Sequence, residues 1–95
     1  MVIVSFADKK TERVFQRQRS RKLPANIQKR ARDKLLVLDN ATCERDLRPL
    51  PGLRHEPSGE DWPGPWRLRI DERWSLCFDW QDGSARAVQI VARPR

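Results

Sequence analysis

The spacing of apolar residues changes part-way along the chain and divides it into a helical half and a strand-rich half. In the first half, apolar side chains recur at helical intervals over residues 24–40, where Pro24 suits the first turn because no N–H is needed there. Four residues carry this repeat: Ile27, Ala31, Leu35 and Leu38. A shorter helix is predicted over residues 9–20, with Asp8 as its N-cap. The β-rich residues 2–6 predict a strand before both helices.

From residue 53 onward, apolar residues alternate with polar ones, as they do in strands with one buried face. Four strands are predicted, over residues 53–57, 66–70, 73–80 and 85–91. Asp82-Gly83 lies between the last two strands and is a signal for a two-residue hairpin turn. The predicted order is therefore β-α-α-β-β-β-β. It describes an α+β fold of one domain, residues 1–95, with both helices packed on one face of a twisted, mainly antiparallel sheet.

Arginines occupy strand positions that face away from the predicted core. The residues expected on this open face are Arg54, Glu56, Arg67, Arg69, Arg73 and Ser75. Guanidinium groups suit bidentate contact with phosphate, and they can stabilise negative charge that develops at phosphorus. The open face is therefore a candidate RNA-binding surface.

Glu56 and His55 add candidate proton-transfer groups to this face. A carboxylate among arginines stays ionised and can take a proton from a nearby hydroxyl. With the arginines, Glu56 would provide the groups for RNA cleavage without a metal, in which the ribose 2′-OH attacks its own phosphate. The alternative for Glu56 is a plain salt bridge to Arg54 or Arg67. His55 is the single histidine and the candidate acid, although the neighbouring strand position directs it to the opposite face.

The charge and the cysteines narrow the class of protein. The net charge of +7 favours nucleic acid, ribosome included, or an acidic protein as partner. Cys43 and Cys77 are not spaced as a disulfide framework or a metal pair, and Cys77 fits a small core residue. No signal peptide or apolar run of membrane length is present. We therefore expect a cytoplasmic protein with no metal, no other cofactor and no membrane contact.

Several stretches resemble one known family. They are "VSFADKKTERVF", "LPANIQKRARDKLLVLDNAT", "LRPLPGLRHE" and "WRLRIDERWSLCFDWQDGSARAVQIV". Together they cover nearly the whole chain and are similar to the HigB branch of the RelE/ParE superfamily of type II toxins. The resemblance implies a RelE-like ribonuclease fold and a ribosome-dependent mRNA endonuclease that inhibits translation. It also implies a cognate helix-turn-helix antitoxin of the HigA type, through which the pair reaches its operator DNA.

The resemblance assigns site residues one by one. It implies a general-base carboxylate at Glu56 and a histidine at His55, and Arg69 matches the arginine that the family has before an isoleucine. The family has a further arginine where this chain has Ser75, and an Asp-Tyr-His type ending where this chain has Ala92, Arg93 and Pro94. Arg73, Arg93 and Arg95 are candidates to compensate. The predicted catalytic residues are therefore Glu56, Arg69, His55 and Arg73, and the predicted RNA-binding residues are Arg54, Arg67, Arg93 and Arg95.

The two substituted positions, Ser75 and Pro94, leave other functions open. One is a catalytically weakened protein of the toxin fold, which acts by binding RNA, the ribosome or a protein target such as gyrase. Another is a basic RNA-binding module unrelated to toxins.

Overall fold

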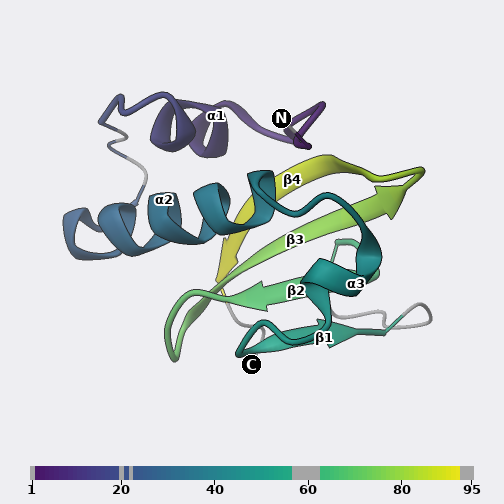
Figure 1. Ribbon diagram of the computed structural model, residues 1–95. Coiled ribbons are helices and arrows are strands. Elements are labelled where there is room, and N and C mark those ends of the chain that lie inside the picture. The colour runs from purple at the N-terminus through teal and green to yellow at the C-terminus, as the bar shows by residue number, and fades with distance from the viewer. Residues whose placement is uncertain (1, 20, 22, 57–62, 93–95) are drawn as a thin grey trace.

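The computed structural model describes residues 2–19, 21, 23–56 and 63–92 and has helices followed by strands (Figure 1). The helices are α1 (Lys9–Phe15), α2 (Ala25–Asp39) and α3 (Glu44–Leu47). The strands are β1 (Leu53–His55), β2 (Trp66–Arg69), β3 (Trp74–Gln81) and β4 (Ser84–Ala92). This arrangement confirms the predicted α+β class. Within these residues, no helix has both the length and the apolar character required to cross a membrane.

The four strands form one antiparallel sheet in the order β1-β2-β3-β4, so each strand pairs with its neighbour in sequence. The predicted hairpin turn joins β3 to β4, where Asp82 and Gly83 have φ angles of 51° and 77°. Two consecutive positive φ angles are what the tight turn between twisted strands requires.

The helices α1 and α2 lie over the same face of the sheet (Figure 1). All four apolar residues predicted to carry the α2 repeat are buried, and their cluster includes the apolar side chains of β2, β3 and β4. Phe78 and Leu47 are both 0% exposed, the first from β3 and the second from α3. The short α3 was not predicted, because four residues are too few to show a helical repeat.

The predicted first helix is confirmed at its start and is shorter than expected at its end. The Asp8 side chain accepts a hydrogen bond from the backbone N–H of Thr11 at 2.9 Å, as an N-cap does. The helix ends at Phe15 and is followed by Arg17, whose φ of 63° lies in the left-handed region. A left-handed residue cannot continue an α-helix, so the predicted helix does not extend over residues 16–19, and residue 20 lies outside the described residues.

The predicted strand at residues 2–6 is reduced to two isolated parallel bridges to β4, Ile3 to Ala85 and Phe6 to Val88. The register of β3 with β4 shifts between Cys77 and Asp79, and Ala87 in β4 has a φ of 51°. This irregularity interrupts the row of backbone groups that a continuous parallel strand would need.

Candidate functional site

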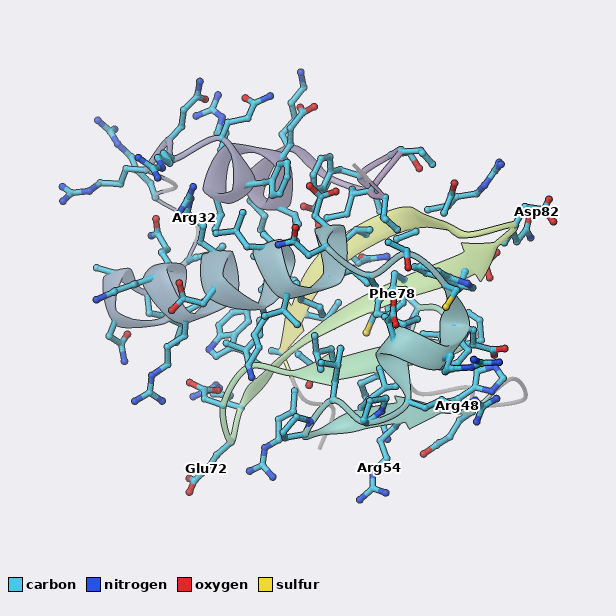
Figure 2. The ribbon with its side chains drawn as sticks, viewed as in Figure 1. Arg32, Arg48, Arg54, Glu72, Phe78 and Asp82 are labelled. Carbon is cyan, nitrogen blue, oxygen red and sulfur yellow. The ribbon has the colours of Figure 1, made fainter. Side chains whose placement is uncertain are left out.

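The antiparallel register arranges the predicted arginines in two rows across the face of the sheet opposite the helices. The first row pairs Arg54 with Arg67, Arg67 with Cys77, and Cys77 with Gln89. The second row, nearer the turn between β2 and β3, pairs Arg69 with Ser75 and Ser75 with Val91. Arg54 extends from β1 on the side of the sheet away from α1 and α2 (Figure 2). The alternation in the sequence therefore placed these residues on one face.

Arg67 of the first row forms an ion pair with Glu56. Arg67 Nη2 donates to Glu56 Oε1 at 2.9 Å, and the two side chains are 19% and 55% exposed. The plain salt bridge to Arg67 that the sequence left open is therefore present. The backbone N–H of Glu56 also donates to the Pro65 carbonyl at 2.8 Å, which holds Glu56 at the end of β1.

Cys77 lies in the first row and is fully buried, although it is not part of the apolar cluster between sheet and helices. Burial raises the pKa of its thiol to about 11, and the charge of Arg67 offsets part of this rise. At neutral pH the thiol is protonated, which makes it a poor nucleophile and a poor metal ligand. Among the described residues, no group of three or more His, Cys, Asp or Glu side chains is placed to hold a metal ion.

His55 lies apart from both rows. It pairs with Trp66 across β1 and β2, and the two rings stack with centroids 4.0 Å apart and an interplanar angle of 21°. Trp66 belongs to the buried cluster on the helix side of the sheet, so His55 projects to that side, as its neighbouring position to Glu56 predicted. The structure therefore does not bring the His55 imidazole together with Arg67 and Arg69.

The second row is built around Gly52. The backbone N–H of Arg69 donates to the Gly52 carbonyl at 3.1 Å, and Gly52 has a φ of 79°. A Cβ at this position would lie 2.9 Å from the Arg69 Cβ, closer than two such atoms approach. Only glycine therefore fits both the backbone conformation and the approach of Arg69. Ser75, the cross-strand partner of Arg69, is 6% exposed.

The turn between β2 and β3 is held by Asp71. Its Oδ1 accepts hydrogen bonds from the backbone N–H groups of Arg73 and Trp74, both at 2.8 Å. The Asp71 carbonyl accepts a bond from Arg69 Nε at 3.0 Å. Because β3 begins at Trp74, the predicted strand starts one residue too early, and Arg73 stands exposed in the turn rather than on a strand.

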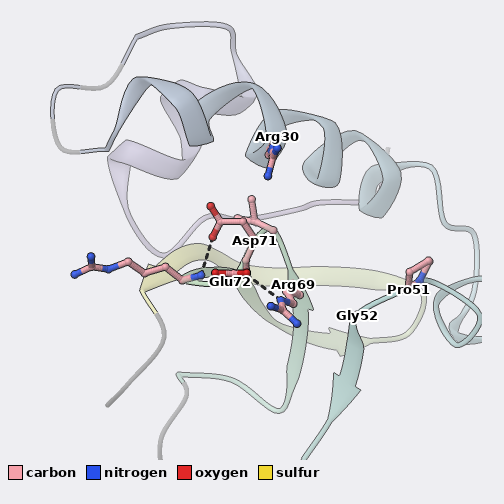
Figure 3. Close-up of a pocket in the computed structure, with 8 residues that line it drawn as sticks. Arg30, Pro51, Gly52, Arg69, Asp71 and Glu72 are labelled. Carbon is pink, nitrogen blue, oxygen red and sulfur yellow. Dashed lines mark hydrogen bonds between the residues drawn. The ribbon is translucent and has the colours of Figure 1, made fainter.

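A pocket of about 620 Å³ lies between this turn and α2 (Figure 3). Its lining residues are Arg30, Pro51, Gly52, Arg69, Ile70, Asp71, Glu72 and Arg73. Arg69 and Arg73 were predicted from the sequence as site residues, but Arg30 was not. Arg30 lies on the charged outer side of α2, and nothing in the order of residues shows that this side meets the turn. The predicted residues Arg93 and Arg95, and the substituted Pro94, lie outside the described residues.

Comparisons with known proteins agree with this fold. Residues 4–91 match the model of a family described as the RelE-like toxin of type II toxin-antitoxin system HigB. The chain is also 35% identical over 83 residues to Toxin HigB-1 of Vibrio cholerae serotype O1 (strain ATCC 39315 / El Tor Inaba N16961). That alignment covers 86% of this chain and 87% of the relative.

Proposed function

Since the chain belongs to the HigB-like family of RelE-like toxins from type II toxin-antitoxin systems, which implies an antitoxin partner, we propose that it cuts mRNA on the ribosome and thereby inhibits translation. The observation that supports this proposal most is the environment of Arg69. Its guanidinium is exposed on the open face, and its one side-chain hydrogen bond in the described part of the chain goes to a backbone carbonyl. A phosphate can therefore approach Arg69 without first displacing a carboxylate.

The proposed reaction is an internal transesterification. The ribose 2′-oxygen attacks the adjacent phosphorus, a 2′,3′-cyclic phosphate forms, and the bond to the 5′-oxygen of the next nucleotide breaks. Glu56 takes the proton of the 2′-hydroxyl, and Arg69 stabilises the charge on the non-bridging oxygens. Water supplies the proton of the departing 5′-oxygen, because the His55 imidazole stacks on Trp66 at the other face.

Glu56 and Arg69 must approach each other for this reaction. Glu56 lies four residues along the chain from Gly52, the neighbour of Arg69, which is about 13 Å along a strand. Arg67 lies between them and holds Glu56 at 2.9 Å. An incoming phosphodiester offers negative oxygens to both arginines, so it competes with Glu56 for Arg67 and with the Asp71 carbonyl for Arg69. In this proposal, RNA binding itself releases the Glu56 carboxylate to act as base.

The proposed partners follow from the same family. We propose that the antitoxin is a helix-turn-helix protein of the HigA type and that this toxin reaches operator DNA only through it. The toxin itself would act on mRNA bound to the ribosome in the cytoplasm.

A second function, binding without cleavage, is favoured by two observations. Ser75 stands where the resemblance places a phosphate-contacting arginine, and it is 6% exposed. Glu56 is engaged by Arg67. A protein of this kind would block the ribosome or a protein target such as gyrase through its basic surface.

Mapping the 5′ ends of translated mRNA by primer extension after induction of the toxin separates the two functions. We expect new 5′ ends inside codons, which Glu56→Ala and Arg69→Ala strongly reduce. Arg13→Ala removes an exposed arginine from α1, away from the open face, and is the matched control that should still cut. Growth arrest without new 5′ ends would contradict cleavage and support binding, and an assay of DNA supercoiling would then test gyrase as the target.

A further inference from the structure

We propose that the pocket between α2 and the β2–β3 turn binds a phosphate group of the RNA backbone, held by Arg30 from the helix layer and Arg73 from the turn. This phosphate would flank the one at Arg69 and Glu56. The choice of RNA as its source rests on the proposed function, whereas the phosphate site itself rests on the pocket.

Arginines from three different elements line the pocket. Arg30 comes from α2, Arg69 from the end of β2, and Arg73 from the turn. Figure 3 shows Arg30 facing across the pocket toward Asp71 in the turn. Within the described residues, no side-chain hydrogen bond or ion pair is found for Arg30 or Arg73. The lining carries three cations against two carboxylates, so its excess of positive charge favours an anion in the pocket.

The two acidic residues of the pocket oppose this site only weakly. Asp71 Oδ1 already accepts two backbone N–H groups at 2.8 Å, which offset part of its charge. Glu72 is exposed at the tip of the turn (Figure 2). The Arg69 guanidinium is anchored by the Asp71 carbonyl, and Arg69 also lines the pocket.

The distribution of charge along the chain also favours a phosphate at this place. Residues 8–34 carry eleven Lys and Arg against three Asp and Glu, a net charge of +8, so within the total of +7 the rest of the chain has a net charge of −1. Arg30 lies at the point where this basic helical region meets the sheet. A single RNA strand that leaves the open face across the pocket therefore passes from the sheet, which is nearly neutral in net charge, onto the strongly basic helical region.

The pocket supplies positive charge that the family pattern places elsewhere. The resemblance expects an arginine at Ser75, and Ser75 is buried beside Arg69 in the second row. Arg73 stands two residues before Ser75, in the turn that lines the pocket. Together with Arg30, Arg73 would supply the positive charge that Ser75 lacks, from two elements outside the sheet.

The test uses a labelled single-stranded RNA with 2′-O-methyl groups, which cannot be cut by 2′-OH attack. Fluorescence anisotropy over a range of salt concentrations gives both the affinity and the slope of log affinity against log salt. We expect Arg30→Gln and Arg73→Gln each to weaken binding about tenfold and to reduce the slope by about 0.7, the value for one lost phosphate contact on a single strand. The matched control is Arg86→Gln, which replaces an exposed arginine of β4 that pairs with Asp79, far from the β2–β3 turn. It should leave the slope unchanged.

A second arm identifies the source of the phosphate, with inorganic phosphate and a nucleoside monophosphate as competitors. Weak competition supports an RNA backbone site. If these small molecules bind tightly in a manner that depends on Arg30 and Arg73, while RNA binding does not, the RNA assignment is overturned. The proposal also fails if all three variants behave alike, or if the wild-type protein does not bind the RNA.

The outcome is independent of cleavage. A protein that binds the uncleavable RNA through Arg30 and Arg73, and yet leaves translated mRNA intact, would refute the proposed nuclease and retain the pocket. A protein that cuts mRNA normally after both arginines are replaced would retain the proposed nuclease and refute the pocket.

Discussion

Arg67 and Arg69 lie two residues apart on one face of β2, and yet their surroundings are opposite. Arg67 is 19% exposed, pairs with Glu56 at 2.9 Å and neighbours the buried Cys77. Arg69 is exposed, bonds a backbone carbonyl and has Gly52 as its neighbour. An arginine that is already neutralised mainly covers the sheet, whereas one beside a glycine and a turn keeps donors available for a ligand. Strand alternation alone makes the two arginines equivalent, and their neighbours distinguish them.

The largest expected difference is in cleavage. Arg69→Ala should reduce the rate of mRNA cleavage on translating ribosomes by about 10²–10³, because it removes a cation that faces the reacting phosphate. Arg67→Ala should cost clearly less, since Arg67 also restrains Glu56 and its loss frees that carboxylate. The measurement is the single-turnover rate at saturating toxin, with thermal unfolding as the control for folding. Equal losses for the two variants would show that Arg67 stabilises the reacting phosphate as much as Arg69 does and that the comparison is wrong.

The second prediction tests whether the first row has a structural role, and it uses the titration of the Cys77 thiol as the probe. The pKa of this thiol is about 11 in the folded protein, against 9.0 for a thiol exposed to water. As the pH rises above about 9, the unfolded chain therefore loses its thiol proton first. The protonated Cys77 thiol contributes its full stabilisation of the folded state below pH 9, and this contribution is lost as the pH approaches 11. The free energy of unfolding should fall by about 2–3 kcal/mol over this range.

Urea unfolding at a series of pH values measures this loss. Cys77→Ala should lack it, and Cys43→Ala, which removes an exposed thiol, should retain it. If the two cysteine variants show the same pH dependence as the wild type, Cys77 does not titrate as a buried group.

Gly52 is the counterpart of Cys77 in the second row. Gly52→Ala places a Cβ 2.9 Å from the Arg69 Cβ on a backbone with φ of 79°. We expect the free energy of unfolding to fall by about 1–3 kcal/mol, because a residue with a Cβ is strained in this conformation. Gly83→Ala is a useful comparison, since its φ is 77° but its added Cβ would find its nearest neighbour at 3.7 Å. A Gly52 variant no less stable than the Gly83 variant would show that the approach of Arg69 is not a constraint.

The sequence predicted those parts of the fold that repeat. The pattern of α2 was correct to about one residue at each end because the apolar residues of its repeat are buried in the core from the first turn to the last. The early end of α1 depends on one left-handed arginine, Arg17, a conformation that this residue type does not signal. The bridges at residues 2–6 depend on an irregularity in β4, far away along the chain.

The site shows the same limit. Period-two alternation predicted that Arg54, Arg67 and Arg69 share a face, because side chains alternate strictly along paired strands. It did not predict that Arg30 would line a pocket with Arg69, because that depends on where α2 crosses the sheet. The choice of Arg67 as the partner of Glu56 also required coordinates, since Arg54 was an equal candidate in the sequence.

The smallest expected effect concerns the stability that the Arg67–Glu56 pair provides. Glu56→Gln keeps the size of the side chain and removes its charge, and we expect the free energy of unfolding to fall by less than about 1 kcal/mol, because Glu56 is 55% exposed and exposed ion pairs contribute little. The same variant should abolish most cleavage, since an amide cannot accept the 2′-hydroxyl proton. Chemical unfolding and the single-turnover assay on one preparation measure both quantities. A variant that unfolds easily and cuts normally would assign Glu56 to structure alone.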